Sequence, residues 1–262
     1  LGDNYLKLDS ISQAINFFQS VLFMEPNNQK YAYKLAALYN KTENYNNAIA
    51  ICDSAISNDS TSFNFVKLKG IACFRKGEYE LASECFTRLL ISGDSTVYFM
   101  KNTGISKYKL NETSEAKDFL RKAYLKDTTD SQITYFLSKC YENSVELDSV
   151  LYFLSKTEGL LMPDSAVMSY LYIDKAGYYH AITEYQMAVK CYIKAYSYKA
   201  ENSLLFNIAS INQYKLNKRE QALKYYEAFI ENVVEIEKST LFELANERVA
   251  FLKRELFFEG KH

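Results

Sequence analysis

Few side chains in this sequence have the type and spacing that catalysis requires. The two histidines are His180 and His262, so a Ser-His-Asp or Cys-His arrangement would have to be built around His180. The sequence has no nucleophile elbow, glycine-rich phosphate loop or HExxH motif. Carboxylate pairs such as Glu243 with Glu247 have the spacing of neighbours on the surface of one helix. The sequence therefore predicts a protein that is not an enzyme.

The cysteines have the spacing of neither a metal site nor a dense disulfide framework. They are Cys52, Cys73, Cys85, Cys140 and Cys191, and no two of them form a CxxC pair. Structural zinc sites use closely spaced ligand pairs, which are missing here. We expect five small buried side chains, with no metal and no cofactor.

The composition indicates the fold class and limits the kinds of partner that the protein can bind. The 31 basic and 32 acidic residues give a net charge of -1, which disfavours direct binding of nucleic acid by phosphate neutralisation. Two prolines, eight glycines and no tryptophan are too few chain breakers for a fold of many short strands. No apolar run approaches the ~20 residues that span a bilayer. The composition favours an all-α protein, and its 23 tyrosines need a packing or binding role.

Small residues recur through the chain at a fixed interval. One series advances by an equal step, with a single longer step after Val150, through Ala14, Ala48, Ala82, Ala116, Val150, Ala188 and Ala222. One helical turn after each stand Phe18, Cys52, Phe86, Leu120, Leu154, Tyr192 and Tyr226. At a constant distance before each stand Gly2, Ala36, Gly70, Gly104, Ser138, Ala176 and Ser210. This period predicts a repeat architecture.

We expect each repeat to form two antiparallel helices. A small residue on the first helix permits close approach, and the alanine of the second helix lies across that contact. The large residue one turn later lies on the same face and fills the gap to the next repeat. Turn residues separate the two helices at 41–44, 75–78, 110–113 and 216–219.

This pattern resembles the tetratricopeptide repeat family, and the Asn- and Tyr-rich composition suggests a bacterial source. The first repeat keeps the family pattern best, with Leu1, Gly2, Tyr5, Ala14, Phe18 and Pro26. Lys69 and Lys175 depart from it, because they replace the large apolar residue beside the small one, and Val150 replaces an alanine. The strict step and the charge balance disfavour the RNA-binding pentatricopeptide repeat.

The resemblance implies a right-handed α-solenoid of about six and a half helix hairpins, forming one domain over residues 1–262. Its repeats are 1–28 (incomplete), 29–62, 63–96, 97–130, 131–164, 169–202 and 203–236, followed by a capping helix at 237–258. Residues 165–168 are extra and should lengthen a helix. Phe257 and Phe258 read as a final packing contact or as an exposed docking patch, and we favour packing. Leu1 falls inside a repeat, so we expect preceding residues; a cytoplasmic or a periplasmic location stays open.

In this family the first helix of each repeat lines a concave groove. Its usual contact positions give the candidate residues Lys30, Tyr33, Asn40, Asn64, Lys67, Tyr98, Lys101, Tyr135, Lys139, Tyr170, Asn207 and Tyr214. Counted over all repeats, these positions hold nine basic and two acidic residues. Five of the nine lie at the end of the first helix, where the helix dipole alone favours a cation. The family's two-carboxylate clamp is not expected, because Ile71 and Ile105 follow Lys67 and Lys101 where it needs asparagine.

The resulting functional prediction is a protein–protein interaction scaffold. Its partner would be a protein or peptide segment of polar to acidic character, held in the groove, with no nucleic acid bound directly. Two other roles stay open: the sensory or regulatory half of a larger signalling or DNA-binding protein, and a structural subunit of a bacterial envelope assembly.

Overall fold

The computed structural model describes residue 2 and residues 10–142, 147–161, 165–232, 240–258 and 260. All regular secondary structure in these residues is α-helical, which confirms the all-α class. Leu1, Tyr5, His262 and the expected start of the capping helix at 237–239 lie outside the described residues. The chain divides into two compact parts, an N-terminal part (Leu1–Leu147) and a C-terminal part (Asp148–His262). A single domain over residues 1–262 stays a prediction.

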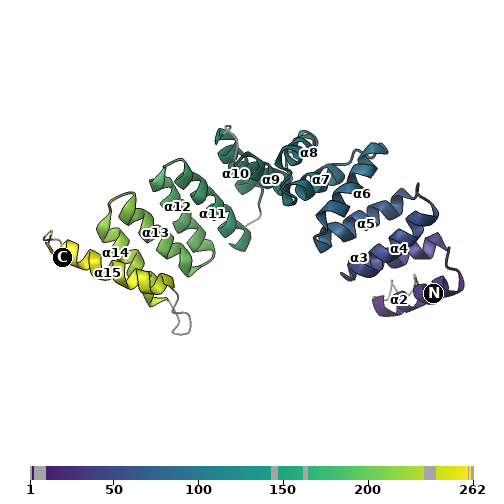
Figure 1. Ribbon diagram of the computed structural model, residues 1–262, viewed down its shortest axis with the longest axis horizontal. Helices are drawn as coiled ribbons and strands as arrows, with labels where there is room; N and C mark the ends of the chain where they lie inside the picture. The colour runs from purple at the N-terminus through teal and green to yellow at the C-terminus, as the bar shows by residue number, and fades with distance from the viewer. Residues whose placement is uncertain are drawn as a thin grey trace. The chain divides into compact units, whose positions relative to one another are not determined.

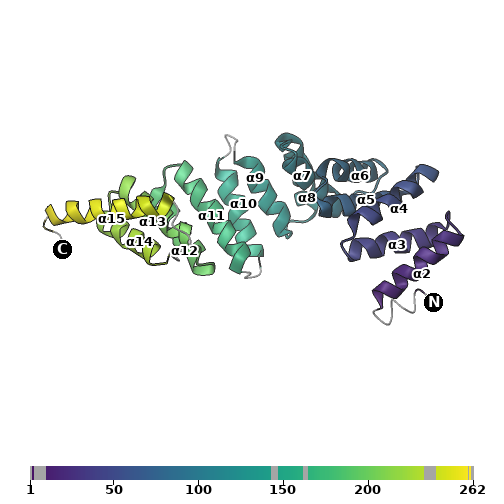
Figure 2. The same cartoon turned by 60° about the horizontal axis from the view of Figure 1, so that its bottom comes forward.

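The N-terminal part is a stack of helix hairpins. It contains α2 (Ile11–Met24), α3 (Gln29–Lys41), α4 (Tyr45–Asn58), α5 (Phe63–Lys76), α6 (Tyr79–Ile91), α7 (Val97–Lys109), α8 (Thr113–Lys126) and α9 (Ser131–Tyr141). Consecutive helices lie side by side (Figures 1 and 2), and α3 also contacts α5 while α7 contacts α9. The pairs α3–α4, α5–α6 and α7–α8 fall within the expected repeats 29–62, 63–96 and 97–130.

The C-terminal part continues the same pattern. It contains α10 (Leu147–Leu160), α11 (Ser165–Ala181), α12 (Tyr185–Tyr198), α13 (Asn202–Tyr214), α14 (Arg219–Glu231) and α15 (Thr240–Phe258). As expected, the extra residues at 165–168 lengthen a helix, since they form the beginning of α11. The last helix, α15, packs on α14.

The recurring small residues mark the closest contacts between helices. Every member of the series from Ala14 to Ala222, including Val150, is completely buried. A Cβ atom added to Gly70 would stand 2.8 Å from Phe86, and one added to Gly104 would stand 2.6 Å from Leu120. In each case the large residue belongs to the second helix of the same hairpin. The first helix therefore needs its small residue for steric reasons.

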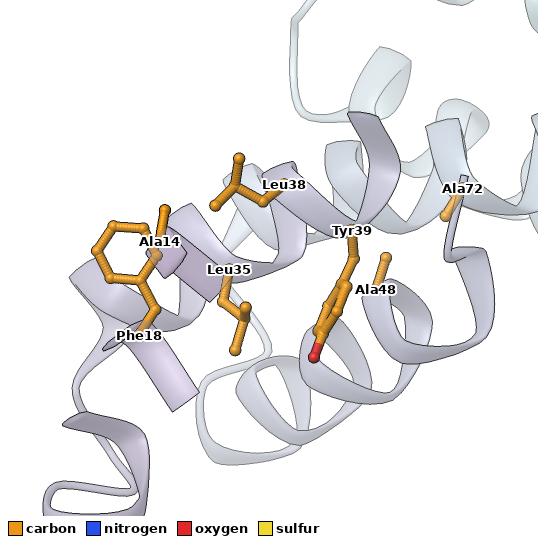
Figure 3. Packing of buried hydrophobic residues seen from close by; sticks show 7 residues of the cluster. All are labelled: Ala14, Phe18, Leu35, Leu38, Tyr39, Ala48 and Ala72. Carbon is orange, nitrogen blue, oxygen red and sulfur yellow. The ribbon is translucent and has the colours of Figure 1, made fainter. Parts of the chain in front are cut away.

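Apolar side chains of successive helices join across these contacts. In the N-terminal part, Figure 3 shows Ala14 and Phe18 of α2 packing with α3 through Leu35. The same buried cluster includes Leu38, Tyr39, Ala48 and Ala72. Burying one large side chain of this kind contributes roughly 1.5–3 kcal/mol. Because each cluster joins neighbouring helices, stability builds up from contacts between adjacent repeats.

Five turns inside hairpins of the described chain each use one residue in the left-handed region of backbone conformation. These residues are Glu43 (φ 60°), Gly77 (φ 90°), Asn111 (φ 64°), Thr183 (φ 63°) and Asn217 (φ 51°). They keep the period of the repeat. Glycine adopts this conformation freely and asparagine tolerates it, whereas the β-branched Thr183 is strained there.

The two lysines that break the family pattern have carboxylate partners. Lys69 pairs with Asp53 at 2.5 Å. Lys175, only 8% exposed, pairs with Glu158 of α10. A charge at a position that normally holds an apolar side chain is tolerated here because an opposite charge accompanies it.

The end of α15 corrects one expectation. Ala245, Leu252 and Leu256 are its buried residues, and Lys253 pairs with Glu227 of α14 at 2.8 Å. Phe257 is 61% exposed and Phe258 is 76% exposed. The packing interpretation of these two rings is wrong, because the buried stripe of α15 ends at Leu256.

Candidate functional site

The candidate residues of the N-terminal part recur at one position in successive first helices. Tyr33 of α3, Lys67 of α5, Lys101 of α7 and Tyr135 of α9 follow one another at equal intervals. Tyr33 and Lys67 are exposed, whereas Lys101 and Tyr135 are half-buried. With Lys30, Asn64, Tyr98 and Lys139, these residues make up what we call the first-helix face.

Ring contacts connect neighbouring helices along the first-helix face. The Tyr33 ring meets Phe65 of α5 edge-on, with centroids 6.0 Å apart. The Lys67 ammonium lies 5.6 Å from the centre of the Phe99 ring of α7. Tyr108 of α7 meets Phe136 of α9 at 5.5 Å. Side chains of neighbouring first helices are therefore in contact from α3 to α5, from α5 to α7 and from α7 to α9.

The tyrosines of this face are held in place while remaining available for contact. Tyr33 is 39% exposed and Tyr98 is 42% exposed. The Tyr98 ring packs edge-on against Phe86 at 6.1 Å and Phe99 at 5.6 Å. Its partial burial raises the pKa of the Tyr98 phenol above its ordinary value, and the protonated hydroxyl can donate a hydrogen bond. A ring fixed in this way loses little freedom when a partner binds.

The positive charge of the face is smaller than the lysine count indicates. Lys101 pairs with Asp130 at 2.7 Å, and Lys139 pairs with Glu142 at 2.7 Å. Lys30 and Lys67 form no ion pair within the described part of the chain. Their ammonium groups lie over aromatic rings, Lys30 at 5.9 Å from the Tyr31 centroid and Lys67 over Phe99.

One candidate residue belongs to the packing between helices. Asn40 is only 5% exposed, and its side-chain amide donates to the Leu68 carbonyl oxygen of α5 at 3.0 Å. A partner on the exposed face cannot reach it, and we remove it from the candidate set. Asn64, by contrast, is exposed.

The C-terminal part carries three candidate residues of its own. Tyr170 of α11 is exposed, with the Lys199 ammonium 5.3 Å from its ring centre. Tyr214 of α13 is exposed as well, and the Arg248 guanidinium lies 5.6 Å from its ring. Asn207, also on α13, is exposed. Both tyrosines thus stand beside a cation from another segment of the same part.

A polar cluster in the C-terminal part was not predicted. Glu158 of α10 accepts hydrogen bonds from the Tyr172 hydroxyl and the Lys175 ammonium of α11, and Lys194 of α12 lies 3.6 Å away. Burial alone would raise the pKa of Glu158, but these hydrogen bonds bring it below its ordinary value. The signal for this cluster in the sequence was Lys175, which stands where the repeat pattern has a large apolar residue. Its partner lies on another helix, so spacing within one helix could not reveal it.

The structure places His180 beside an aromatic ring. His180 is exposed and its ring meets Tyr185 edge-on at 5.3 Å. No group of three or more His, Cys, Asp or Glu side chains in the described part could hold a metal ion. Within the same residues, no helix has the length and apolar character needed to cross a membrane.

The fold and the face define a class: an all-α protein of stacked helix hairpins whose first helices present fixed aromatic and basic side chains. Residues 29–62 and residues 203–233 match family models described as tetratricopeptide repeat. The chain therefore contains tetratricopeptide repeats at these two ranges. No curated protein sequence matches it.

Solved structures of similar fold belong to the same class. A structure entitled YrrB, a TPR protein with an unusual peptide-binding site, superposes with a TM-score of 0.60 at 18% identity, over 71% of this chain and 94% of that chain. MamA from Desulfovibrio magneticus RS-1 gives a TM-score of 0.56 at 14% identity, over 61% and 90% of the two chains. Another MamA structure gives 0.57 at 19% identity, over 64% and 90%. At these identities the likeness concerns the fold.

Proposed function

We propose that this protein is a protein–protein interaction scaffold that binds a segment of its partner on the first-helix face of the N-terminal part. Tetratricopeptide repeats support the general role. The observation that carries the specific proposal is the pair Tyr33 and Tyr98, each about two-fifths exposed and packed against buried rings. Such rings offer contact area at low entropic cost. The related fold of YrrB, whose title names a peptide-binding site, supports a peptide-like ligand.

The partner segment is proposed to be polar to acidic. Lys30 and Lys67 supply charge that no carboxylate of the described chain neutralises, and Asn64 can hydrogen-bond to an extended backbone. Lys101 contributes less than its position indicates because its ammonium already pairs with Asp130. The regulatory and envelope-assembly roles would each use such a surface and stay open proposals.

Charge reversal at the two unpaired lysines tests this proposal. A partner is captured from an extract of the source cell, purified, and titrated against wild type and Lys30→Glu/Lys67→Glu. We expect the variant to bind at least ~10-fold more weakly, since close charge pairs across an interface contribute strongly and like charges repel. Helix content by circular dichroism should not change, because both side chains are exposed.

A matched control separates this surface from total charge. Lys190→Glu/Lys224→Glu makes the same charge change at exposed lysines of α12 and α14 that form no ion pair in the described chain. This control should bind like wild type. Equal affinity of the partner for wild type and the Lys30/Lys67 variant would move the binding site off the first-helix face.

A further inference from the structure

A cleft of about 490 Å³ lies among α6, the end of α7 and the beginning of α8, entirely within the N-terminal part. This volume falls in the range of ~300–1,000 Å³ that is typical of ligand sites. Its charged lining residues are Glu80, Glu84, Glu112, Glu115, Arg88 and Lys107. Its large apolar lining residues are Ile91, Leu110 and Phe119. We call it the acidic cleft, because four carboxylates face two cations.

Two of the four carboxylates share one cation of the protein. Lys107 forms ion pairs with both Glu112 and Glu115, the latter at 3.1 Å. These contacts raise the pKa of Lys107, with its hydrogen bond to Glu112 as the largest cause. This side of the cleft therefore keeps one unbalanced negative charge.

The α6 wall carries the two carboxylates of the cleft that have no ion-pair partner in the described chain. Glu80 and Glu84 lie one turn apart on α6, both exposed, and neither forms an ion pair within the described residues. Arg88 is engaged elsewhere, because it donates to the Ser60 carbonyl oxygen and lies 5.9 Å from the Phe63 ring centre. Like charges at this spacing repel each other along a helix. The α6 wall is thus a pair of free carboxylates beside an apolar surface.

The apolar side of the acidic cleft is open to a ligand. Ile91 at the end of α6 is 82% exposed, and Phe119 of α8 is half-buried. The ammonium of Lys122, one turn further along α8, lies 5.5 Å from the Phe119 ring centre. The Phe119 ring therefore already has a cation of the protein beside it, which leaves apolar contact as its role toward a partner.

A second cleft in the same part of the protein provides a contrast. It measures about 360 Å³ and is lined by residues of α2, α3 and α4 and of the α2–α3 connection, including Pro26, Asn27 and Asn58. None of its lining residues is charged. The negative charge of the acidic cleft therefore comes from the carboxylates of α6 and α8 and of the turn before α8. It is not a general property of clefts in this protein.

We propose that the acidic cleft is a docking site for a basic segment of a partner protein, in which an apolar side chain stands next to lysine or arginine. The apolar side chain would cover Ile91 and Phe119, and the cations would pair with Glu80 and Glu84. Charge complementarity selects this occupant, because nucleic acids and anionic membranes would be repelled. The site uses α6 and α8, so it is independent of the first-helix face.

Binding of a short fluorescent peptide built from leucine and lysine tests the site on the whole chain. Wild type should bind this peptide, and Glu80→Lys/Glu84→Lys should bind it at least ~10-fold more weakly. Ile91→Ser, a change at an exposed position that leaves the fold intact, should also weaken binding. The corresponding peptide of leucine and glutamate should not bind.

The matched control is Glu243→Lys/Glu247→Lys, which makes the same charge change at the same spacing on exposed residues of α15. It should bind the leucine–lysine peptide like wild type. Equal weakening by both double variants, or equal binding of the two peptides, would overturn the proposal. Self-association of the wild type that Glu80→Lys/Glu84→Lys abolishes, measured by sedimentation, would make a second copy the occupant and overturn it too.

Discussion

Gly70 and Gly104 show at the scale of single residues why a small side chain recurs in every repeat. A Cβ atom at either position would stand within 3.0 Å of an atom of a large side chain on the partner helix. Glycine is otherwise unfavourable inside a helix. Its presence is explained by the space that Phe86 and Leu120 occupy, and this is why sequence spacing alone could locate these contacts.

We expect Gly104→Ala to destabilise the protein by roughly 1–3 kcal/mol. The added methyl group would meet Leu120 Cγ at 2.6 Å and the Ala116 carbonyl oxygen at 3.1 Å, and a backbone oxygen cannot move aside as a side-chain end can. Urea unfolding followed by circular dichroism measures the effect. The control is Gly177→Ala in α11, where an added Cβ has no neighbour within 4 Å; it should stabilise by roughly 0.5–1 kcal/mol through helix propensity. Similar effects of the two changes would disprove the steric explanation.

At the scale of helices, the structure differs from the sequence-based expectation mainly in how charges are paired. Lys101 was expected to face a partner, yet it pairs with Asp130, the residue that precedes α9. The same carboxylate caps α9 by accepting from the backbone N–H of Gln132 and of Ile133. The repeat period predicts which helices are neighbours. It does not predict the side-chain conformations that decide which lysine forms an ion pair with a carboxylate.

Two changes at Asp130 separate its capping role from its ion pair. Asp130→Ala should cost roughly 1–2 kcal/mol, because the α9 cap and the Lys101 pair are lost together. Asp130→Asn keeps a capping oxygen and removes only the charge, so the loss should be roughly 0–1 kcal/mol. Urea unfolding at low and high salt compares the variants. Equal losses would mean that capping contributes little and that the ion pair dominates.

The candidate sites illustrate the limit of prediction at the scale of elements. Tyr33, Lys67 and Tyr98 could be placed on one face because each lies on a first helix at a fixed position. The acidic cleft could not be predicted from the sequence, because Glu80 and Phe119 lie on different helices. Each of them, taken alone, resembles an ordinary surface residue. The repeat position predicts Asn40 as a contact residue, and only the packing of the helices shows that it is buried.

At the scale of the whole molecule, the five buried thiols link stability to pH. All five cysteines among the described residues are buried and unpaired in disulfides. Burial raises the pKa of Cys52, Cys73 and Cys140 to about 12, and that of Cys85 to about 11. The pKa of Cys191, in the C-terminal part, is raised by burial as well. Both parts of the chain therefore hold neutral thiols that unfolding would release.

The direction of the pH effect follows from these values. An unfolded thiol ionises near the ordinary pKa of 9.0, whereas folded Cys52 stays protonated up to about 12. Between these values the unfolded state binds fewer protons, so the free energy of unfolding falls as the pH rises. Each such thiol lowers it by up to ~1.4 kcal/mol per pH unit.

Urea unfolding between pH ~8 and ~10 should therefore show decreasing stability, and Cys52→Ala should reduce the slope against pH by up to ~1.4 kcal/mol per unit. The slope is the informative quantity, because the smaller side chain also lowers stability at every pH by leaving a cavity. Tyrosines with raised pKa, such as Tyr226 at about 12, contribute to the total slope but not to its change in the variant. A slope identical in wild type and Cys52→Ala would show that the thiol ionises equally in the folded and unfolded states, and burial could then not be the cause of its protonation.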